Sequence, residues 1–355
     1  MKDKILIALS GGVDSAAAAL ILTKAGYKTA GVTMKLYSDS EQMRDSDNVD
    51  LPTQDIIDAK SICDLLGIEH KAVSFGKSFC ECVIDPFIRE YKNGGTPNPC
   101  VDCNRTIKFG ALLDYALANG FDKLATGHYA RIEYVDGRYL LKRAADLKKD
   151  QSYFLWSLTQ KQLSHVLFPL GDMTKSEIRE LAASNGFVNA HKSDSQDICF
   201  IIDGDYASFI EGYTNESFPC GDFIDTDNNV LGRHSGIIRY TVGQRKGLGI
   251  ALGFPAFVKE KNPINNTVTL CADSELYSKK LYASRANFSA VDSLKIPTRL
   301  TAKIRYRHEP APATVTQTSD TTFTVEFDEP QRAAAKGQSA VLYDGDTVIG
   351  GGIIE

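Results

Sequence analysis

The 355-residue chain lacks an apolar run long enough to cross a membrane, and its first residues lead into an expected strand, not a signal peptide. It also lacks a basic excess, because 40 Lys and Arg stand against 45 Asp and Glu. Such a chain is not a general nucleic-acid binder, so any RNA contact must come from local basic patches. We find no internal repeats or low-complexity tracts. The length favours two or three globular domains, and we expect them in the cytoplasm.

The eight cysteines lack the spacing of a disulfide scaffold or a zinc site. Cys100 and Cys103 form a C-x₂-C pair, and the sequence offers no matching second pair for structural zinc. Cys103 directly precedes a helix expected over residues 105–118, where a thiol has a lowered pKa and is a better nucleophile. Its expected partner is Cys199. Cys63, on the apolar face of an expected helix, is interpreted as a packing residue.

The chain begins with an expected strand over residues 5–9, a glycine turn at Gly11 and Gly12, and a helix from Ser15 to Ala25. The N–H groups and positive dipole end of that helix form an anion site. A Walker P-loop would place a lysine here, and none is present. The six residues from Ser10 to Ser15 instead resemble the loop of the N-type ATP pyrophosphatases, which bind ATP. The alternative is a tight turn without a ligand.

Expected strands over residues 29–34, 68–75 and 122–126 alternate with helices over residues 55–66, 77–92 and 105–118. This alternation predicts an α/β fold with a doubly wound parallel sheet, whose ligands lie at the carboxyl ends of the strands. The polar segment 38–53 is expected to be a loop. Further expectations are a hairpin turned at Asp136-Gly137, a helix opening at residues 148–152, and a helix N-cap at Thr174.

The composition changes near residue 203, where the segments become short and rich in Gly, Asp and Asn. From about residue 268 the pattern is all-β and predicts a small barrel, with a last hairpin turned at Asp344-Gly345. We therefore expect a catalytic domain over residues 1–202, a small central domain over 203–267, and a C-terminal β-barrel domain over 268–355.

Several stretches, weak singly but specific together and in this order, resemble the tRNA-specific 2-thiouridylases (tRNA-uridine 2-sulfurtransferases), and the resemblance runs from residue 4 to the carboxyl terminus. They are the Ser10–Ser15 loop and residues 96–104, 125–129, 149–155, 197–201, 243–249, 303–307 and 327–339.

The resemblance implies an enzyme that uses ATP and Mg²⁺ to adenylate the 2-oxygen of the wobble uridine of tRNA, with AMP as the leaving group. It implies that Cys199 carries persulfide sulfur, that Cys103 is the nucleophile, and that a disulfide forms between them. It also implies a persulfide donor, such as a cysteine desulfurase or a relay protein. The residues it assigns to ATP are Ala8, Leu9, Ser10, Gly11, Gly12, Val13, Asp14, Ser15, Met34 and Gly127.

The residues that the resemblance assigns to tRNA are Asn98, Pro99, Cys100, His128, Lys149, Asp150, Gln151, Arg305, Tyr306 and Gln338. Lys303, Arg305 and Arg307 alternate along an expected strand, so their charges should share one face toward phosphate. The alternative for these three is an ordinary solvated face. Arg245 and Lys246, in a glycine-framed loop, are further basic candidates without an assigned contact.

Cys100 departs from the family pattern, because many members carry an Asp with an acid/base role at this position. Asp102 is close in sequence but is expected to face elsewhere. Cys100, Cys103 and Cys199 could instead supply three thiolates to an iron–sulfur cluster, an alternative to the persulfide route. Two other readings stay open. One is an ATP pyrophosphatase that adenylates a small molecule, and the other is a metal-binding module that has no enzyme activity.

Overall fold

The computed structural model describes residues 2–36, 53–187, 198–201, 204–253, 255–294 and 296–355. The expected loop at 38–53 lies outside these ranges apart from its last residue. The chain folds as two compact units, which are treated separately below. The first comprises residues 1–83, 100–196 and 345–349, and the second comprises residues 84–99, 197–344 and 350–355.

The first unit contains a five-stranded, wholly parallel sheet in the order β3-β2-β1-β4-β7. Its strands are β1 (Lys4–Ala8), β2 (Lys28–Lys35), β3 (His70–Ser74), β4 (Lys123–Ala125) and β7 (Val166–Leu167). The strand order runs outward from β1 on one side and from β4 on the other. The predicted doubly wound sheet is therefore confirmed, and its switch point lies between β1 and β4.

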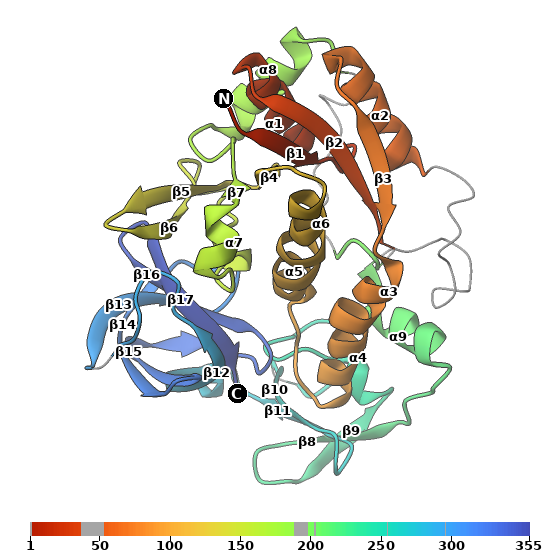
Figure 1. The fold of residues 1–355 in the computed structure, drawn as a ribbon. Coiled ribbons are helices and arrows are strands. Elements are labelled where there is room, and N and C mark those ends of the chain that lie inside the picture. The colour runs from red at the N-terminus through yellow and green to blue at the C-terminus, as the bar shows by residue number, and fades with distance from the viewer. Residues whose placement is uncertain (1, 37–52, 188–197, 202–203, 254, 295) are drawn as a thin grey trace. The chain divides into compact units, whose positions relative to one another are not determined.

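Helices cover both faces of this sheet because β1 is apolar on both sides (Figure 1). On one face, Ile5 and Ile7 pack against Ala19 of α1 and Ala59 of α2. On the other, Leu6 borders a cavity of about 180 Å³ that Tyr115 of α6 also lines. The helices of this unit are α1 (Val13–Lys24), α2 (Gln54–Leu66), α3 (Gly76–Phe79), α5 (Pro99–Asp102), α6 (Leu112–Ala118), α7 (Gln160–Ser164) and α8 (Lys175–Ser184).

Local side-chain chemistry explains where several elements begin and turn. The hairpin of β5 (Ala130–Val135) and β6 (Arg138–Arg143) turns at Asp136 and Gly137, with φ of 50° and 83°, as a type I′ turn requires. Thr174 caps α8 through the expected capping box with Glu177. Both sequence predictions are confirmed.

The prediction that a helix begins at residues 148–152 is wrong. Only a single 3₁₀ turn forms, Ser152–Phe154. The reason is Asp150, which is 2% exposed and accepts hydrogen bonds from the N–H groups of Ala144 and Ser152. Such side-chain bonds to nearby backbone compete with helix formation. The aromatic side chains of Tyr153 and Trp156 in this segment are buried.

The second unit holds two β structures. The first is a four-stranded sheet in the order β10-β11-β8-β9, and the second is an antiparallel barrel in the order β12-β15-β14-β13-β16-β17, closed by pairing of β12 with β17. The expected C-terminal barrel is thus confirmed. The elements of this unit are α4 (Asp85–Lys92), α9 (Tyr206–Thr214), β8 (Gly221–Ile224), β9 (Val230–His234), β10 (Phe257–Asn262), β11 (Thr267–Cys271), β12 (Tyr277–Asn287), β13 (Thr298–Lys303), β14 (Ala311–Ser319), β15 (Thr322–Arg332), β16 (Ser339–Asp344) and β17 (Thr347–Ile354), whose first residues belong to the first unit.

The loop of residues 93–99, after α4, is attached to both β structures of the second unit. Lys261 of β10 is 6% exposed, and its ammonium donates to the Gly95 carbonyl at 2.9 Å and lies 5.2 Å from the Tyr91 ring centroid. Gln338 of the barrel donates to the Thr96 carbonyl at 2.8 Å. Burial lowers the pKa of Lys261 from 10.5 to about 8.

The described residues contain no helix with the length and hydrophobicity of a membrane span.

We expect the folded protein to gain stability relative to Lys261→Met as pH rises from about 8 to 10.5. In that window the unfolded chain still binds a proton at Lys261 that the folded chain has released, so rising pH favours folding. The gain should be about 3 kcal/mol. Urea unfolding at a series of pH values measures it.

Lys259→Met, on the same strand but 38% exposed at its side chain, is the matched control. Its unfolding free energy should follow the pH dependence of the unchanged protein. Parallel curves for the unchanged protein and Lys261→Met would show that Lys261 does not titrate in this window.

Candidate functional site

The glycine turn after β1 lies at the switch point of the parallel sheet, where ligands of such sheets bind. Gly11 has a φ of +69°, and a Cβ atom there would stand 3.0 Å from the Asp55 carbonyl oxygen of α2. The Ser15 hydroxyl accepts from the N–H of Ser10 at 3.2 Å and donates to the Gly12 carbonyl at 3.0 Å. The turn is therefore closed by its own side chain, and it leads the first N–H groups of α1 toward one spot.

A charged cluster stands at the N-terminus of α1. The Asp14 carboxylate accepts from the Lys175 ammonium at 2.7 and 2.8 Å and from the Tyr129 hydroxyl at 2.7 Å. Lys175 is only 8% exposed and is the first residue of α8, while Tyr129 follows β4. Three segments far apart in sequence thus fix one carboxylate and one ammonium beside the glycine turn.

Gly127 lies against this same helix terminus. A Cβ atom at position 127 would stand 2.7 Å from the carbonyl carbon of Asp14 and 2.8 Å from the N of Ser15. Only glycine permits such a close backbone approach. The residues after β4 are therefore packed directly onto the first turn of α1.

His128, the next residue, is 8% exposed. Lys108 donates to its Nε2 at 3.4 Å, and its Nδ1 lies 2.7 Å from the Thr126 hydroxyl oxygen. Burial, and then the Lys108 charge, lower the pKa of His128 well below its usual value. The imidazole is neutral at physiological pH, and Lys108 assigns its proton to Nδ1.

The Cys100–Cys103 segment is helical from Pro99 onward, which differs from the expectation that Cys103 lies just before a helix. Cys100 is in the first turn, and Cys103 begins a π-helical stretch, Cys103–Ala111, that continues into α6. Cys103 is 8% exposed and lies inside the helical segment that begins at Pro99, so its thiol is not at a helix N-terminus. The proline explains the early start, because its fixed φ suits the first helical position.

Cys100 reaches the surface but is closely surrounded by protein atoms, and this desolvation raises its pKa, opposed by the charge of Lys108. Asp102 bonds Arg105 at 3.1 Å. Cys199 belongs to the second unit and is exposed. Cys63 is fully buried among apolar side chains, as expected, and burial raises its pKa to about 11. Within the described ranges, no three His, Cys, Asp or Glu side chains are placed to hold a metal ion.

Nearly the whole chain matches known family models. Residues 3–203 match the tRNA methyl transferase HUP domain, residues 207–272 the tRNA methyl transferase PRC-barrel domain, and residues 278–354 the aminomethyltransferase beta-barrel domain. The tRNA-specific 2-thiouridylase MnmA of Clostridioides difficile (strain 630) is 47% identical over 357 residues, which are 100% of this chain and 99% of the relative. The chain belongs to this family.

The tRNA-specific 2-thiouridylase MnmA of Treponema denticola (strain ATCC 35405) is 48% identical over 362 residues, 99% of this chain and 98% of the relative. The solved structures found by comparison are less similar to this chain than these relatives are. A 4-thiouridine synthetase–RNA complex with bound ATP covers 60% of this chain and 50% of that chain, with a TM-score of 0.36 and 17% identity.

The residues at the glycine turn fit the polyphosphate of ATP, which the family uses. The turn and the first N–H groups of α1 supply donors for anionic oxygens, and the buried Lys175 ammonium adds a positive charge. Both Asp14 oxygens accept from protein donors, so Mg²⁺ would be held chiefly by the phosphate oxygens and water. Met34, also assigned to ATP, is a half-buried residue of β2.

The structure brings together Asp14, Ser15 and Gly127 among the residues expected to bind ATP. Of those expected to bind tRNA, His128 and Asp150 are buried, and Gln151 accepts from the Tyr129 N–H at 2.9 Å. Lys149, Asn98 and Tyr306 are half-buried, Pro99 is buried, and Cys100 is exposed.

The prediction that Lys303, Arg305 and Arg307 share one face of a strand is wrong, because only Lys303 lies in the strand. β13 ends at Lys303, which is 7% exposed, and the His308 N–H then bonds the Arg305 carbonyl in a turn. The Arg305 guanidinium donates to the carbonyls of Val242 and Ala333 at 3.0 and 2.6 Å. These bonds to other segments stop the strand, so the three charges do not form one row.

Sequence reasoning missed Lys175, Tyr129 and Lys108 as site residues. The sequence pattern marks Lys175 only as the residue that follows the predicted N-cap, Thr174. Its role depends on a contact with a residue 161 positions away, which no local pattern reveals. The one available signal was a lysine at the first position of a helix, where a cation is unfavourable unless it has a partner.

We expect Lys175→Met and Asp14→Asn each to lower ATP turnover by about 100-fold. Asp14 holds the Lys175 ammonium beside the phosphate site, so each change removes the same positive charge from its working position. The double variant should be no slower than the worse single one, because the two residues act as a unit. The rate of pyrophosphate release measures all three.

Lys60→Met is the matched control, since Lys60 pairs with Asp64 on an exposed face of α2. Its turnover should be unchanged. Losses that multiply in the double variant would contradict a shared function of Asp14 and Lys175.

Proposed function

We propose that the protein is a tRNA-uridine 2-sulfurtransferase, which replaces the 2-oxygen of the wobble uridine by sulfur at the expense of ATP. The observation that carries this proposal is the full-length match, at 47% identity, to proteins named tRNA-specific 2-thiouridylase. The site is consistent with it, because a nucleotide-type glycine turn and a helix with two cysteines are built into the same unit.

The first step is adenylation of the uridine. The 2-oxygen attacks the α-phosphorus of ATP, and pyrophosphate leaves. The N–H groups at the start of α1 and the Lys175 ammonium hold the departing pyrophosphate and offset its charge. Mg²⁺ supplies further charge neutralisation on the phosphates when it is bound. The poor leaving group on C2 is thereby converted into AMP.

The second step transfers sulfur. The terminal sulfur of a Cys199 persulfide attacks C2, AMP leaves, and C2 is joined to Cys199 through two sulfur atoms. The Cys103 thiolate then attacks the Cys199 sulfur, which forms a Cys103–Cys199 disulfide and leaves the thiocarbonyl on the base. A dithiol reductant must restore both thiols. We therefore place the reaction in the reducing cytoplasm, with a persulfide-bearing protein as the donor.

Cys100 fits a role in which it stays protonated. Its desolvation raises the thiol pKa, so near neutral pH the group can donate a proton but rarely carries charge. The alternative is that Cys100, Cys103 and Cys199 bind an iron–sulfur cluster. The experiment below distinguishes the two.

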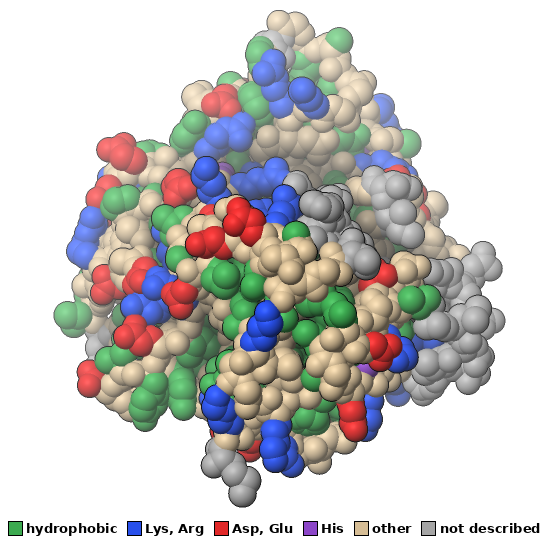
Figure 2. Space-filling view, turned by 90° about the horizontal axis from the view of Figure 1, so that it is seen from above, with side chains coloured by type: hydrophobic (Ala, Val, Ile, Leu, Met, Phe, Trp, Pro, Cys, Tyr) green, Lys and Arg blue, Asp and Glu red, His purple; other side chains and the backbone are tan. Residues whose placement is uncertain are grey.

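The tRNA would be held by local basic groups, because the chain as a whole is acidic. Lys and Arg side chains lie beside Asp and Glu on the surface, and several of them adjoin one another (Figure 2). Arg305 and Gln338 also tie segments of the second unit together, so they contribute both to the fold and to the expected RNA contact. The target base must leave its stack to reach the cysteines.

We expect Cys199→Ser to abolish 2-thiouridine formation with a persulfide donor while tRNA-dependent pyrophosphate release continues. The change removes the sulfur carrier but none of the groups that hold ATP. Cys220→Ser, which replaces another exposed cysteine of the second unit, should thiolate normally. Mass spectrometry of digested tRNA and a pyrophosphate assay give the two readouts. Full thiolation by Cys199→Ser would show that the carrier is assigned wrongly.

Anaerobic assays with iron-loaded and iron-stripped protein test the chemistry of the sulfur step. Equal thiolation in both would support the persulfide route, and thiolation only with iron would favour the cluster. Pyrophosphate release without tRNA, at the full rate, would instead indicate a small-molecule adenylating enzyme.

A further inference from the structure

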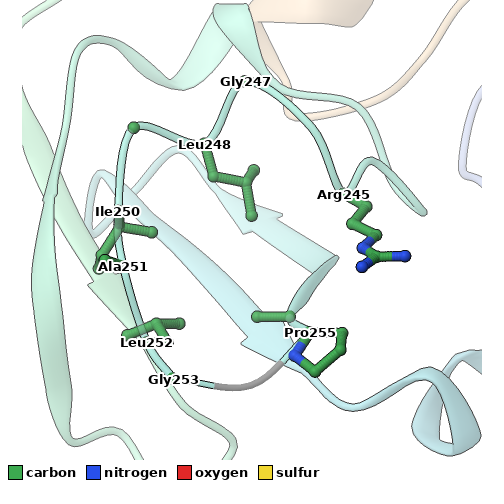
Figure 3. Close-up of a pocket in the computed structure, with 10 residues that line it drawn as sticks. Arg245, Gly247, Leu248, Ile250, Ala251, Leu252, Gly253 and Pro255 are labelled. Carbon is green, nitrogen blue, oxygen red and sulfur yellow. The ribbon is translucent and has the colours of Figure 1, made fainter.

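The loop formed by residues 245–253, 255 and 256, in the second unit, borders a hollow of about 740 Å³ (Figure 3). This volume lies within the 300–1,000 Å³ typical of ligand sites. The loop carries the glycine-rich basic motif that the steps above do not use. Its glycines Gly247, Gly249 and Gly253 have φ of +74°, +71° and +72°, so the chain curls in a way that L side chains rarely allow.

The lining suits an occupant with one apolar face and one anionic group. Figure 3 shows Leu248 and Pro255 on opposite sides of the hollow, with Leu252 along the loop and the Arg245 guanidinium to one side. Among the ten described residues that line it, Arg245 alone is charged, and none carries a carboxylate. An unstacked base offers such an apolar face, and its phosphate pairs with arginine.

A residue expected to contact tRNA bonds the segment just ahead of the loop. Arg305, which the family resemblance assigns to tRNA, donates to the Val242 carbonyl just ahead of the loop. Arg245 and Arg332 lie 6.0 and 5.0 Å from the centroid of the Phe257 ring. Burial and the charges of Arg305, Arg332 and Lys303 lower the pKa of nearby His308, which agrees with a locally positive region.

The loop is also anchored firmly enough to present a defined site. Gln244 accepts from the Thr241 N–H at 2.9 Å through its side chain and donates to the Lys246 carbonyl at 3.0 Å. The backbone of Gln244 bonds Val258 of β10, and Leu248 is 7% exposed. Arg245 is thus held at the edge of the hollow, while Lys246 does not line it.

We propose that this hollow binds one unpaired nucleotide of the tRNA other than the target uridine. The base lies against Leu248, Leu252 and Pro255, and its phosphate pairs with Arg245. The site would read whether a nucleotide is free to leave the helical stack, and so help to select tRNA over paired RNA. This inference rests on the proposed function.

Arg245 and Lys246 form a matched pair for the first test, since they carry the same charge and only Arg245 lines the hollow. The probe is an unmodified tRNA transcript with a wobble uridine, and the readout is the dissociation constant by filter binding. Arg245→Ala should weaken binding about tenfold, and Lys246→Ala about twofold or less. Equal losses in the two variants would overturn the subsite, because a diffuse positive surface would explain them.

A second pair tests the apolar face. Leu252→Asp places a carboxylate in the hollow and should also weaken binding about tenfold, while Val230→Asp, on an exposed position of β9, should not. Circular dichroism confirms that each variant is folded. Unchanged affinity in folded Leu252→Asp would overturn the subsite.

A photo-crosslinking amino acid at position 252 identifies the occupant. A crosslink to an unpaired nucleotide other than the target uridine supports the proposal. A crosslink to the target uridine, a crosslink within a stem or no crosslink contradicts it. Failure of the subsite can be distinguished from failure of the proposed function. If the unchanged protein thiolates tRNA and the variants bind normally, only the subsite is lost. If the unchanged protein neither binds nor thiolates tRNA, the proposed function is lost with it.

Discussion

The ion pair between Asp14 and Lys175 is the constraint on which the first unit depends. A lysine that is 8% exposed needs a partner, and Asp14 supplies both carboxylate oxygens to it. The carboxylate in turn suits the positive end of α1. The pair therefore requires β1 with its glycine turn, the segment after β4 and the start of α8 to meet at one point. A phosphate group bound at the turn would meet a positive charge that is already desolvated and held in place.

Lys108, on the helical segment that carries Cys100 and Cys103, interacts with two different groups. Lys108 bonds the buried, neutral His128, and its charge also opposes the rise in the pKa of Cys100. The π-helical stretch that begins at Cys103 carries Lys108 on the same continuous helix. Such stretches are frequent at functional sites, and they change which way the side chains around them project. One cation thus affects the environment of both His128 and Cys100.

Local chemistry explains which features could be predicted from sequence. The glycine turn, the hairpin at Asp136-Gly137 and the Thr174 cap depend on residues within a few positions of each other, and all three were predicted. Lys175 could not be assigned, because its partner Asp14 is distant in the chain. The end of β13 at Lys303 also depends on distant partners, because Arg305 bonds Val242. The missing helix at Asp150 has a local cause, since the Asp150 side chain bonds nearby backbone N–H groups and so opposes helix propensity.

The loop before Cys100 belongs to the second unit and continues directly into the first. The backbone carbonyls of this loop accept hydrogen bonds from Lys261, in the four-stranded sheet of the second unit, and from Gln338 of the barrel. The Thr96 N–H of the loop donates to the Lys336 carbonyl. Pro99 ends this loop and begins the helix of Cys100, so the connection is one peptide bond long. The bonds within the second unit therefore fix the backbone that leads directly into the cysteine helix.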